Sequence, residues 1–436
     1  MGTKLLLTIL AAIQRLMGLI AGLFARLSPE KYAPQLNWPS PTGAHAVGIV
    51  DTVLDITERT DPHHQGHRRL PLKVWYPAAT INGYKQRPLI NDTELPIFIR
   101  GMTKAMPVSA FMVQRIGGSL TNAYQDAPVA NGPFPILLFN EGFAGTISQN
   151  SHLAEEIASQ GYIVISVDHP GGASASAFPD GSGHILNDDL RGMMMSPDLM
   201  RPAMAMKRSK TFAERYEALK GYLAFAPLEA EGRIWVDDLT NVMDALDAKK
   251  VPSPLLPILE QAELGKIAIA GMSFGGAASA AFAHQDNRIT CAINLDGGQF
   301  GSELLEQPIR CPLLMVHSSF ATFTDGGGYN DFFYSYLGTA DDEDHVARYV
   351  IDQTGHIDFT DMTIFGHGPV AKLLGLGGIE GSKMLTLTAT LVSSFLSTHL
   401  KGGADNNRFD GTSLMATNPN LRQQDMTGLH AWRRTQ

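Results

Sequence analysis

Residues 265–276 read G-K-I-A-I-A-G-M-S-F-G-G, an apolar run that ends abruptly in a G-x-S-x-G motif. The small residues that follow, A-A-S-A-A-F-A-H, predict a strand, a sharp turn and a helix in direct succession. Such a turn strains the backbone at its centre, and a Cβ atom at Gly271 or Gly275 would collide with the adjoining strand and helix. Ser273 is therefore a candidate nucleophile. A chance match is the alternative in a chain with 43 glycines, but the flanking pattern disfavours it.

The composition is that of a folded protein with a large core. Of 436 residues, 44% are hydrophobic and 18% are charged, which argues against a disordered chain. The formal net charge of -9 argues against a nucleic-acid-binding surface. One large domain with additions is favoured, because α/β sheets reach this size. The two cysteines, Cys291 and Cys311, are compatible with one disulfide or with two buried free thiols.

Residues 5–27 form an apolar segment with few polar side chains. An arginine near the middle of a span costs about 2.5–3.5 kcal/mol, which disfavours a simple transmembrane helix. The polar residues fall instead at helical steps of four and seven along one stripe, formed by Lys4, Thr8, Arg15, Gly22 and Arg26. This pattern favours a helix that lies in a membrane interface or caps a hydrophobic partner, and membrane association is the expectation. A secretory signal is the alternative, which would give a secreted or periplasmic protein, although no clear small-x-small cleavage site follows.

Short apolar runs alternate with helical patterns along the rest of the chain. Strands are predicted at residues 46–56, 70–75, 134–140, 162–168, 266–272, 290–296, 312–317 and 347–352. Helices are predicted at residues 151–160, 235–248, 275–284 and 384–400. This alternation predicts an α/β fold with a mostly parallel central sheet and helices on both faces. Ligands of such sheets bind beyond the carboxyl ends of the strands, where Ser273 is placed.

One segment does not fit the alternation. Residues 171–232 contain closely spaced methionines and a helical pattern, and they are interpreted as a helical insertion. Its methionines serve either as core filler or as the lining of an acyl pocket. The predicted organisation is an N-terminal helix over 1–28, a catalytic domain over 29–400 that includes this insertion, and a polar C-terminal tail over 401–436.

A serine hydroxyl becomes an effective nucleophile when an imidazole takes its proton and a carboxylate orients that imidazole. After a strand-turn-helix G-x-S-x-G motif, the acid precedes the histidine in the chain. The acid candidates are Asp296, Asp325 and Asp331. Asp296 is preferred because it directly ends an apolar run and is followed by two glycines, whereas the others lie deeper in a loop.

The histidine candidates downstream are His317, His345, His356, His367 and His399. His356 is preferred because it lies in a glycine-marked loop directly after a predicted strand, in the sequence Q-T-G-H-I-D-F-T-D. His317 is expected to complete a strand, and His399 to end the last helix. The histidines within residues 63–67 lack a supporting carboxylate pattern, so they are expected to form a polar loop rather than a metal site.

Acyl transfer also requires N-H donors for the developing oxyanion. The residue after the nucleophile supplies one of them, which here is the backbone N-H of Phe274. The second is expected from the loop after the strand at 134–140, which reads N-E-G-F-A-G. The backbone N-H of Phe143 is the candidate in that loop.

Several motifs together resemble those of a known family. They are V-W-Y-P at residues 74–77, L-L-F-N-E-G-F-A-G, S-Q-G-Y-I-V-I-S-V-D-H-P, G-M-S-F-G-G, I-N-L-D-G-G and G-H-I-D-F-T-D. Over roughly residues 46–400 the chain resembles the plasma-type platelet-activating-factor acetylhydrolases. These form a branch of the α/β hydrolases near the bacterial dienelactone hydrolase-like and polyester-degrading enzymes.

The resemblance implies an α/β-hydrolase fold and a role for each candidate residue. It makes Ser273 the nucleophile, Asp296 the acid and His356 the base, with oxyanion donors at Phe143 and Phe274. It implies no cofactor and no metal requirement for the chemistry. The chain departs from the family at residues 141–142, where Glu-Gly replaces the usual His-Gly.

The expected activity is that of a serine esterase working through an acyl-enzyme on small-molecule esters. Short or medium acyl esters, including lipid-like or polyester-like ones, are the expected substrates. The alternatives are an acyltransferase or peptidase with the same triad, or a non-catalytic α/β-hydrolase scaffold that binds a ligand or partner. The sequence leaves the oligomeric state open.

Overall fold

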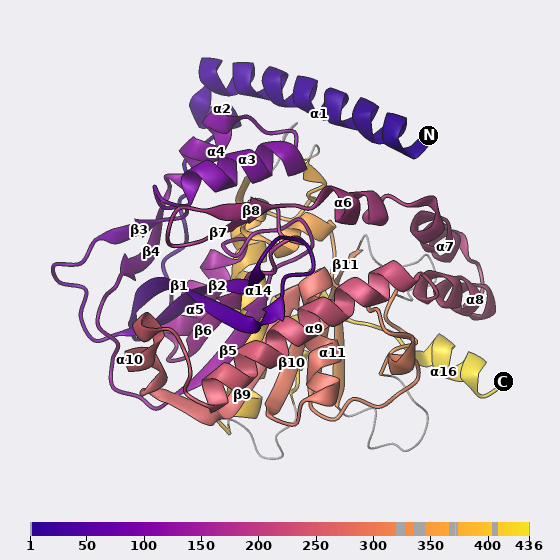
Figure 1. The fold of residues 1–436 in the computed structure, drawn as a ribbon. Coiled ribbons are helices and arrows are strands. Elements are labelled where there is room, and N and C mark those ends of the chain that lie inside the picture. Colours follow the sequence, from indigo (N-terminus) through magenta and orange to yellow (C-terminus); the bar gives the residue numbers. More distant parts are fainter. Residues whose placement is uncertain are drawn as a thin grey trace. The chain divides into compact units, whose positions relative to one another are not determined.

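A computed structural model describes residues 2–319, 328–334, 345–365, 371, 374–402 and 409–435 (Figure 1). Contacts within the chain define two compact units, each built from several segments. The first unit comprises residues 1–134, 143–192 and 245–262. The second comprises residues 135–142, 193–244 and 263–436.

The first unit contains mixed strands in the order β6-β2-β1-β4-β3. β1 (Ala46–Thr60) and β2 (His67–Ala78) form a long antiparallel pair. β6 (Ile163–Val167) is antiparallel to β2, and β4 (Leu120–Gln125) is parallel to β1 and antiparallel to β3 (Gln86–Pro88). β7 (Ala175–Ala177) and β8 (Gly183–Ile185) form a separate hairpin. The predicted strands at 46–56, 70–75 and 162–168 are thus confirmed, with β1 and β2 longer than expected.

The first unit also contains several helices. They are α1 (Gly2–Leu27), α2 (Pro29–Tyr32), α3 (Leu95–Ala105), α4 (Ala110–Gly117), α5 (Ser151–Ser159) and α10 (Leu256–Leu259). Ser109 begins α4 as an N-cap, because its hydroxyl accepts a hydrogen bond from the Met112 amide. α1 packs against α2 and α4. Among the described residues, a helix long and apolar enough to cross a bilayer is not found.

The second unit carries the parallel part of the fold, with its strands in the order β13-β12-β11-β10-β9-β5. These strands are β5 (Phe134–Asn140), β9 (Ala262–Met272), β10 (Ile289–Leu295), β11 (Leu313–Ser318), β12 (Val346–Ile351) and β13 (Leu421–Gln423). β9, β10, β11 and β12 run parallel to one another, and β13 is antiparallel to β12. β5, β10 and β11 are buried almost throughout, as expected when helices cover both faces. The predicted mostly parallel sheet is confirmed.

Helices of the second unit flank this sheet, and α11 and α14 both pack against β10. The helices include α7 (Pro197–Arg208), α8 (Phe212–Leu223), α9 (Ala226–Asp247), α11 (Phe274–Gln285), α14 (Gly381–Leu400), α15 (Thr412–Thr417) and α16 (Thr427–Arg433). With α6 (Asp188–Met194), α7 and α8 make the methionine-rich segment helical. The segment after residue 400 contributes β13 as well as α15 and α16. Cys291 and Cys311 are both buried free thiols.

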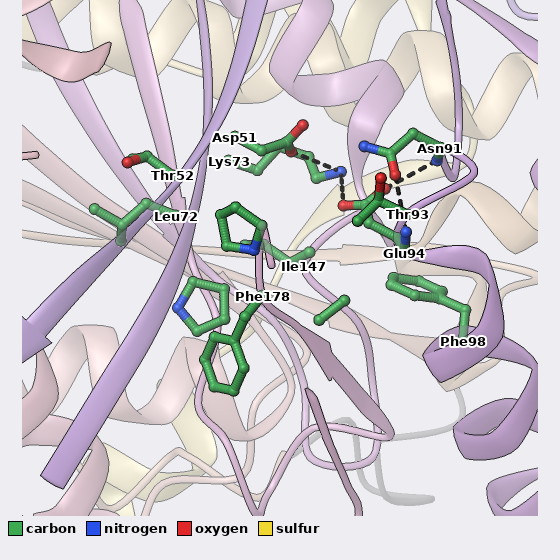
Figure 2. Close-up of a pocket in the computed structure, with 13 residues that line it drawn as sticks. Asp51, Thr52, Leu72, Lys73, Asn91, Thr93, Glu94, Phe98, Ile147 and Phe178 are labelled. Carbon is green, nitrogen blue, oxygen red and sulfur yellow. Dashed lines mark hydrogen bonds and ion pairs between the residues drawn. The ribbon is translucent and has the colours of Figure 1, made fainter. Parts of the chain in front are cut away.

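A buried ion-pair network in the first unit connects β1, β2 and β3 with the start of α3, and Figure 2 shows its members Asp51, Lys73 and Glu94. The Lys73 ammonium on β2 lies 2.8 Å from Glu94 Oε1, next to the start of α3, and 3.1 Å from Asp51 Oδ1 on β1. Arg87 on β3 pairs with both carboxylates as well. Burial acts to raise the pKa of Asp51, but the charges of Lys73 and Arg87 outweigh it and leave that pKa below its ordinary value. The network borders a cavity of about 170 Å³.

Because Lys73 is buried between two carboxylates, Lys73→Met is expected to lower the free energy of unfolding by about 3–5 kcal/mol. The loss comes from leaving buried negative charge without its partner. The double variant Lys73→Met/Glu94→Gln should recover part of the lost free energy of unfolding, since the second change removes one of the buried carboxylates. Urea denaturation followed by circular dichroism measures the free energy of unfolding of the two variants. Lys250→Met, at an exposed lysine, is the control. A loss in Lys73→Met no larger than in Lys250→Met would contradict a stabilising network.

Candidate active site

The sharp turn between β9 and α11 holds Ser273 in an unusual conformation. Its φ is 56° and its ψ is -125°, a region that residues with a Cβ atom rarely adopt. The backbone is fixed there because the Ser273 amide donates to the Leu295 carbonyl at 2.8 Å. Strain of this kind costs on the order of 1–3 kcal/mol and is concentrated at functional sites. The predicted strand, turn and helix around Ser273 are confirmed.

Glycines make this turn sterically possible. A Cβ atom on Gly271 would lie 2.3 Å from the carbonyl carbon of Gly275, at the start of α11. One on Gly275 would lie 2.1 Å from the Glu141 carbonyl oxygen, just after β5. Both distances are far inside van der Waals contact, so the predicted reason for these two glycines is confirmed. Gly142 also lies close to the serine, since its added Cβ would be 3.0 Å from Ser273 Cβ.

Asp296 directly follows β10, the strand next to β9, and is nearly inaccessible to solvent. Its Oδ1 accepts a hydrogen bond from the Ser318 amide at 2.7 Å. Its Oδ2 lies 2.7 Å from Nδ1 of His356. The two carboxylate oxygens therefore have separate partners. The hydrogen bond from the Ser318 amide fixes the carboxylate in the orientation that the imidazole requires.

His356 follows β12 and begins a short 3₁₀ helix, η4 (His356–Phe359). Its Nε2 lies 2.9 Å from Ser273 Oγ, so the imidazole links the serine to Asp296. Asp358 stabilises this loop, because its Oδ2 accepts from the Gly355 amide at 2.7 Å and its Oδ1 from the Thr363 hydroxyl at 2.8 Å. The structure thus brings together the three residues that the sequence singled out, all of them within the second unit.

The competing acids and histidines have other environments. Asp331 is buried, accepts a hydrogen bond from the Gly328 amide at 2.7 Å, and also accepts one from Gln424. Burial raises the pKa of Asp331 to about 6. Burial lowers the pKa of His317, inside β11, and of His399, near the end of α14, to about 4 in each case. Asp325 and His367 lie outside the described residues.

Phe274, the residue after the serine, is part of an aromatic cluster that the sequence did not reveal. Its ring centroid lies 4.9 Å from that of Trp235 on α9 and 4.8 Å from that of Phe300. The three side chains are buried. They form a buried apolar cluster next to the nucleophile turn, built from residues far apart in the sequence.

The oxyanion donors stay predictions. Phe274 is the first residue of α11, where a backbone N-H has no carbonyl acceptor one turn earlier in its own helix. Phe143 follows β5 in the chain and belongs to the first unit. The side chain of Glu141, at the position where the resemblance led us to expect histidine, is buried.

Of the histidines within residues 63–67, His63 and His64 contact the Asp61 carboxylate, whereas His67 lies 3.3 Å from Asp55 Oδ1. Asp61 Oδ1 accepts hydrogen bonds from the amides of His63 and His64, both at 2.8 Å, and Arg68 pairs with Oδ2 at 2.9 Å. His64 stacks on His184 with ring centroids 3.7 Å apart. A group of histidine, cysteine and carboxylate side chains able to hold a metal ion is not found in the part of the chain that the structure describes.

A mostly parallel sheet with helices on both faces, and a serine on a strained turn between strand and helix, define the α/β-hydrolase fold. A solved structure with this fold, a ferulic acid esterase from Streptomyces cinnamoneus, aligns with a TM-score of 0.61 at 21% identity. The alignment covers 88% of this chain and 98% of that one.

Residues 31–421 match the family model of platelet-activating factor acetylhydrolase, isoform II, and the chain belongs to this family. The platelet-activating factor acetylhydrolase of Cavia porcellus is 23% identical, over 86% of this chain and 80% of its own length. That of Bos taurus is also 23% identical, over 91% and 87%. The predicted family is therefore confirmed, and membership in it indicates a hydrolase of carboxylic esters.

If Asp296 orients His356 during catalysis, Asp296→Asn should lower kcat for a nitrophenyl ester by about 10⁴-fold, because the amide favours the wrong imidazole tautomer. Asp331→Asn is the matched control, since it changes a buried acid that contacts Gln424 rather than His356. It should leave kcat within a few fold. Equal losses in the two variants, or a larger one in Asp331→Asn, would assign the acid elsewhere.

Proposed function

We propose that this chain is a serine esterase that cleaves carboxylic esters through an acyl-enzyme, with Ser273, His356 and Asp296 as its catalytic triad. The observation that carries the proposal is a pair of linked contacts, in which His356 Nδ1 lies 2.7 Å from Asp296 Oδ2 and Ser273 Oγ lies 2.9 Å from His356 Nε2. Family membership supports ester hydrolysis as the reaction. The strained conformation of Ser273 supports its assignment as the nucleophile.

In the proposed mechanism, His356 Nε2 accepts the Ser273 proton as Oγ attacks the ester carbonyl. The backbone N-H groups of Phe274 and Phe143 are the proposed donors to the oxyanion of the tetrahedral intermediate. His356 then gives its proton to the departing alcohol, which leaves an acyl group on Ser273. A water molecule, deprotonated by His356, releases the acid and restores the serine. Asp296 holds the imidazole in the required tautomer and stabilises its positive charge.

Esters with short or medium acyl groups are the proposed substrates, and lipid-like or polyester-like esters are included. The names of the two acetylhydrolases that resemble this chain make acetyl esters the first to test. A panel of nitrophenyl esters graded by acyl length separates these choices.

Three other functions are compatible with the same fold. An acyltransferase or peptidase would use the same three residues, and a binding scaffold would use none of them for chemistry. A fluorophosphonate probe distinguishes these functions when it is combined with the ester assay. Labelling with turnover supports the esterase, labelling without turnover supports transfer or peptide cleavage, and no labelling supports a scaffold.

We also propose that α1 holds the protein at a membrane surface. Between residues 16 and 27, α1 exposes a set of large apolar side chains, Leu16, Met17, Leu19, Ile20, Leu23, Phe24 and Leu27. A helix with one continuous apolar face of this kind lies in the membrane interface with that face among the acyl chains. A cleaved secretory signal remains the alternative role of this segment.

Ser273→Ala should reduce kcat by roughly a millionfold while the protein stays folded, because the change deletes only the attacking hydroxyl. It should also abolish labelling by the fluorophosphonate probe. Hydrolysis of nitrophenyl acetate and near-ultraviolet circular dichroism measure the two effects. Near-normal turnover by a folded, probe-negative variant would end the serine-esterase proposal.

Removal of residues 1–28 should abolish flotation with phosphatidylcholine vesicles, because it removes the apolar face of α1. Turnover of a soluble short-chain ester should persist, since Ser273, Asp296 and His356 lie in the second unit. Turnover of a dispersed, lipid-like ester should fall. If full-length and truncated proteins float alike, or if the native mature protein begins beyond residue 27, α1 is not an anchor.

A further inference from the structure

A basic pocket lies beside α1 in the first unit. Its lining comes from α1, α3, β8 and α6, and consists of Arg15, Arg100, Thr103, Lys104, Ile185, Asp188 and Arg191. Among these described residues, four side chains are cationic and one is a carboxylate. The cavity volume is about 500 Å³, enough for a small anionic group with several oxygen atoms. The protein as a whole carries a net charge of -9, so this concentration of positive charge is local.

Two of the four cations are held by the protein itself. The Lys104 ammonium lies 2.9 Å from Asp188 Oδ1 and donates to the Leu186 carbonyl at 2.9 Å. The Arg191 guanidinium donates to the Lys104 carbonyl at 3.1 Å. Arg15 and Arg100 have no ion-pair partner within the described part of the chain, and both are exposed. The pocket therefore presents two guanidinium groups that an external anion can bind.

The packing of α1 determines which of its sides is free. A seam of small residues faces the segment around α4: a Cβ atom on Gly22 would lie 2.7 Å from Ser109 Cβ, and one on Gly18 would lie 3.1 Å from the Val108 carbonyl. Ala25 is buried in the same contact, with Met112. The large apolar side chains of α1 lie on the remaining surface and are exposed. Figure 1 shows α1 as an outer helix that lies alongside α3 and α4.

Arginines border the exposed apolar face of α1. At about 100° per residue, Arg15 and Arg26 differ by only about 20° around the helix, so they form one line along it. Arg15 is also four residues from Leu19, a step that places the two on adjoining parts of the same side. The cationic line therefore lies between the small-residue seam and the apolar face. This is where lipid phosphates lie when an apolar helical face enters the acyl region.

We propose that the basic pocket binds the headgroup of an anionic phospholipid in the membrane on which α1 lies. The proposal rests on the membrane association of α1 proposed above. Guanidinium groups bind phosphate oxygens in pairs, which suits Arg15 and Arg100 to a phosphodiester. The apolar face next to the pocket accepts the acyl chains of the same lipid layer, so a membrane lipid fits better than a free anion. The pocket thus makes binding selective for negatively charged membranes.

Flotation of the full-length protein with two kinds of vesicle tests this proposal. On phosphatidylcholine vesicles containing phosphatidylglycerol, Arg15→Gln/Arg100→Gln should bind about thirtyfold more weakly than the wild type, since each cation near an anionic surface contributes about 1 kcal/mol. On pure phosphatidylcholine vesicles the two proteins should bind alike. Added salt should remove the difference, because it screens the attraction.

Lys85→Gln/Lys250→Gln is the matched control, because it removes two exposed charges outside the pocket. It should bind anionic vesicles as the wild type does. Equal losses in the two double variants would overturn the proposal in favour of a general charge effect. Unchanged binding of the arginine variant to anionic vesicles, or equal loss on both vesicle types, would also overturn it. Flotation does not depend on hydrolysis, so these results remain distinct from a failure of the proposed esterase activity.

Discussion

The close approach of α11 to the ends of β9 and β5 is the constraint on which the site depends. Only hydrogen atoms fit at Gly271 and Gly275, where an added Cβ would come within 2.3 Å of another backbone atom. That contact goes with a positive φ at Ser273, whose hydroxyl oxygen lies 2.9 Å from His356 Nε2. The neighbouring parallel strands then supply the partners of the hydroxyl. Asp296 follows β10 and His356 follows β12. Their side chains meet near Ser273 because the carboxyl ends of parallel strands lie at one edge of a sheet.

The parallel strands of the second unit could be predicted from the sequence with small errors. β5 coincides with the expected residues, and β10 differs by one residue at each end. Such strands are covered on both faces and appear as continuous apolar runs. β3 and β4 were not predicted, since their sequences Q-R-P and L-T-N-A-Y-Q are short or mostly polar. β4 is placed by pairing with β1, which is distant in the sequence, and β3 by pairing with β4, and such pairing leaves no local pattern.

The order of residues in the chain was enough to select Ser273 and His356, but it did not explain how the acid is held. The difference between Asp296 and Asp331 lies in contacts across the fold. Asp296 accepts from the Ser318 amide of a neighbouring strand, whereas Asp331 accepts from Gln424, far along the chain. The Asp358 contacts that stabilise the histidine loop, and the cluster around Phe274, are likewise tertiary. Sequence spacing alone therefore identifies the candidates without their supporting partners.

The pairing of β13 with β12 affects the order in which the site can form during synthesis. β13 is antiparallel to β12 and covers its outer side, and the Asp352 amide at the end of β12 donates to the Asn420 carbonyl at 2.7 Å. Asp352 lies shortly before His356 in the chain. The strand that places the base is therefore completed by residues that leave the ribosome well after the base itself. Until they emerge, β12 is an open sheet edge, so a nascent chain already carrying Ser273, Asp296 and His356 must be protected there from pairing with other chains.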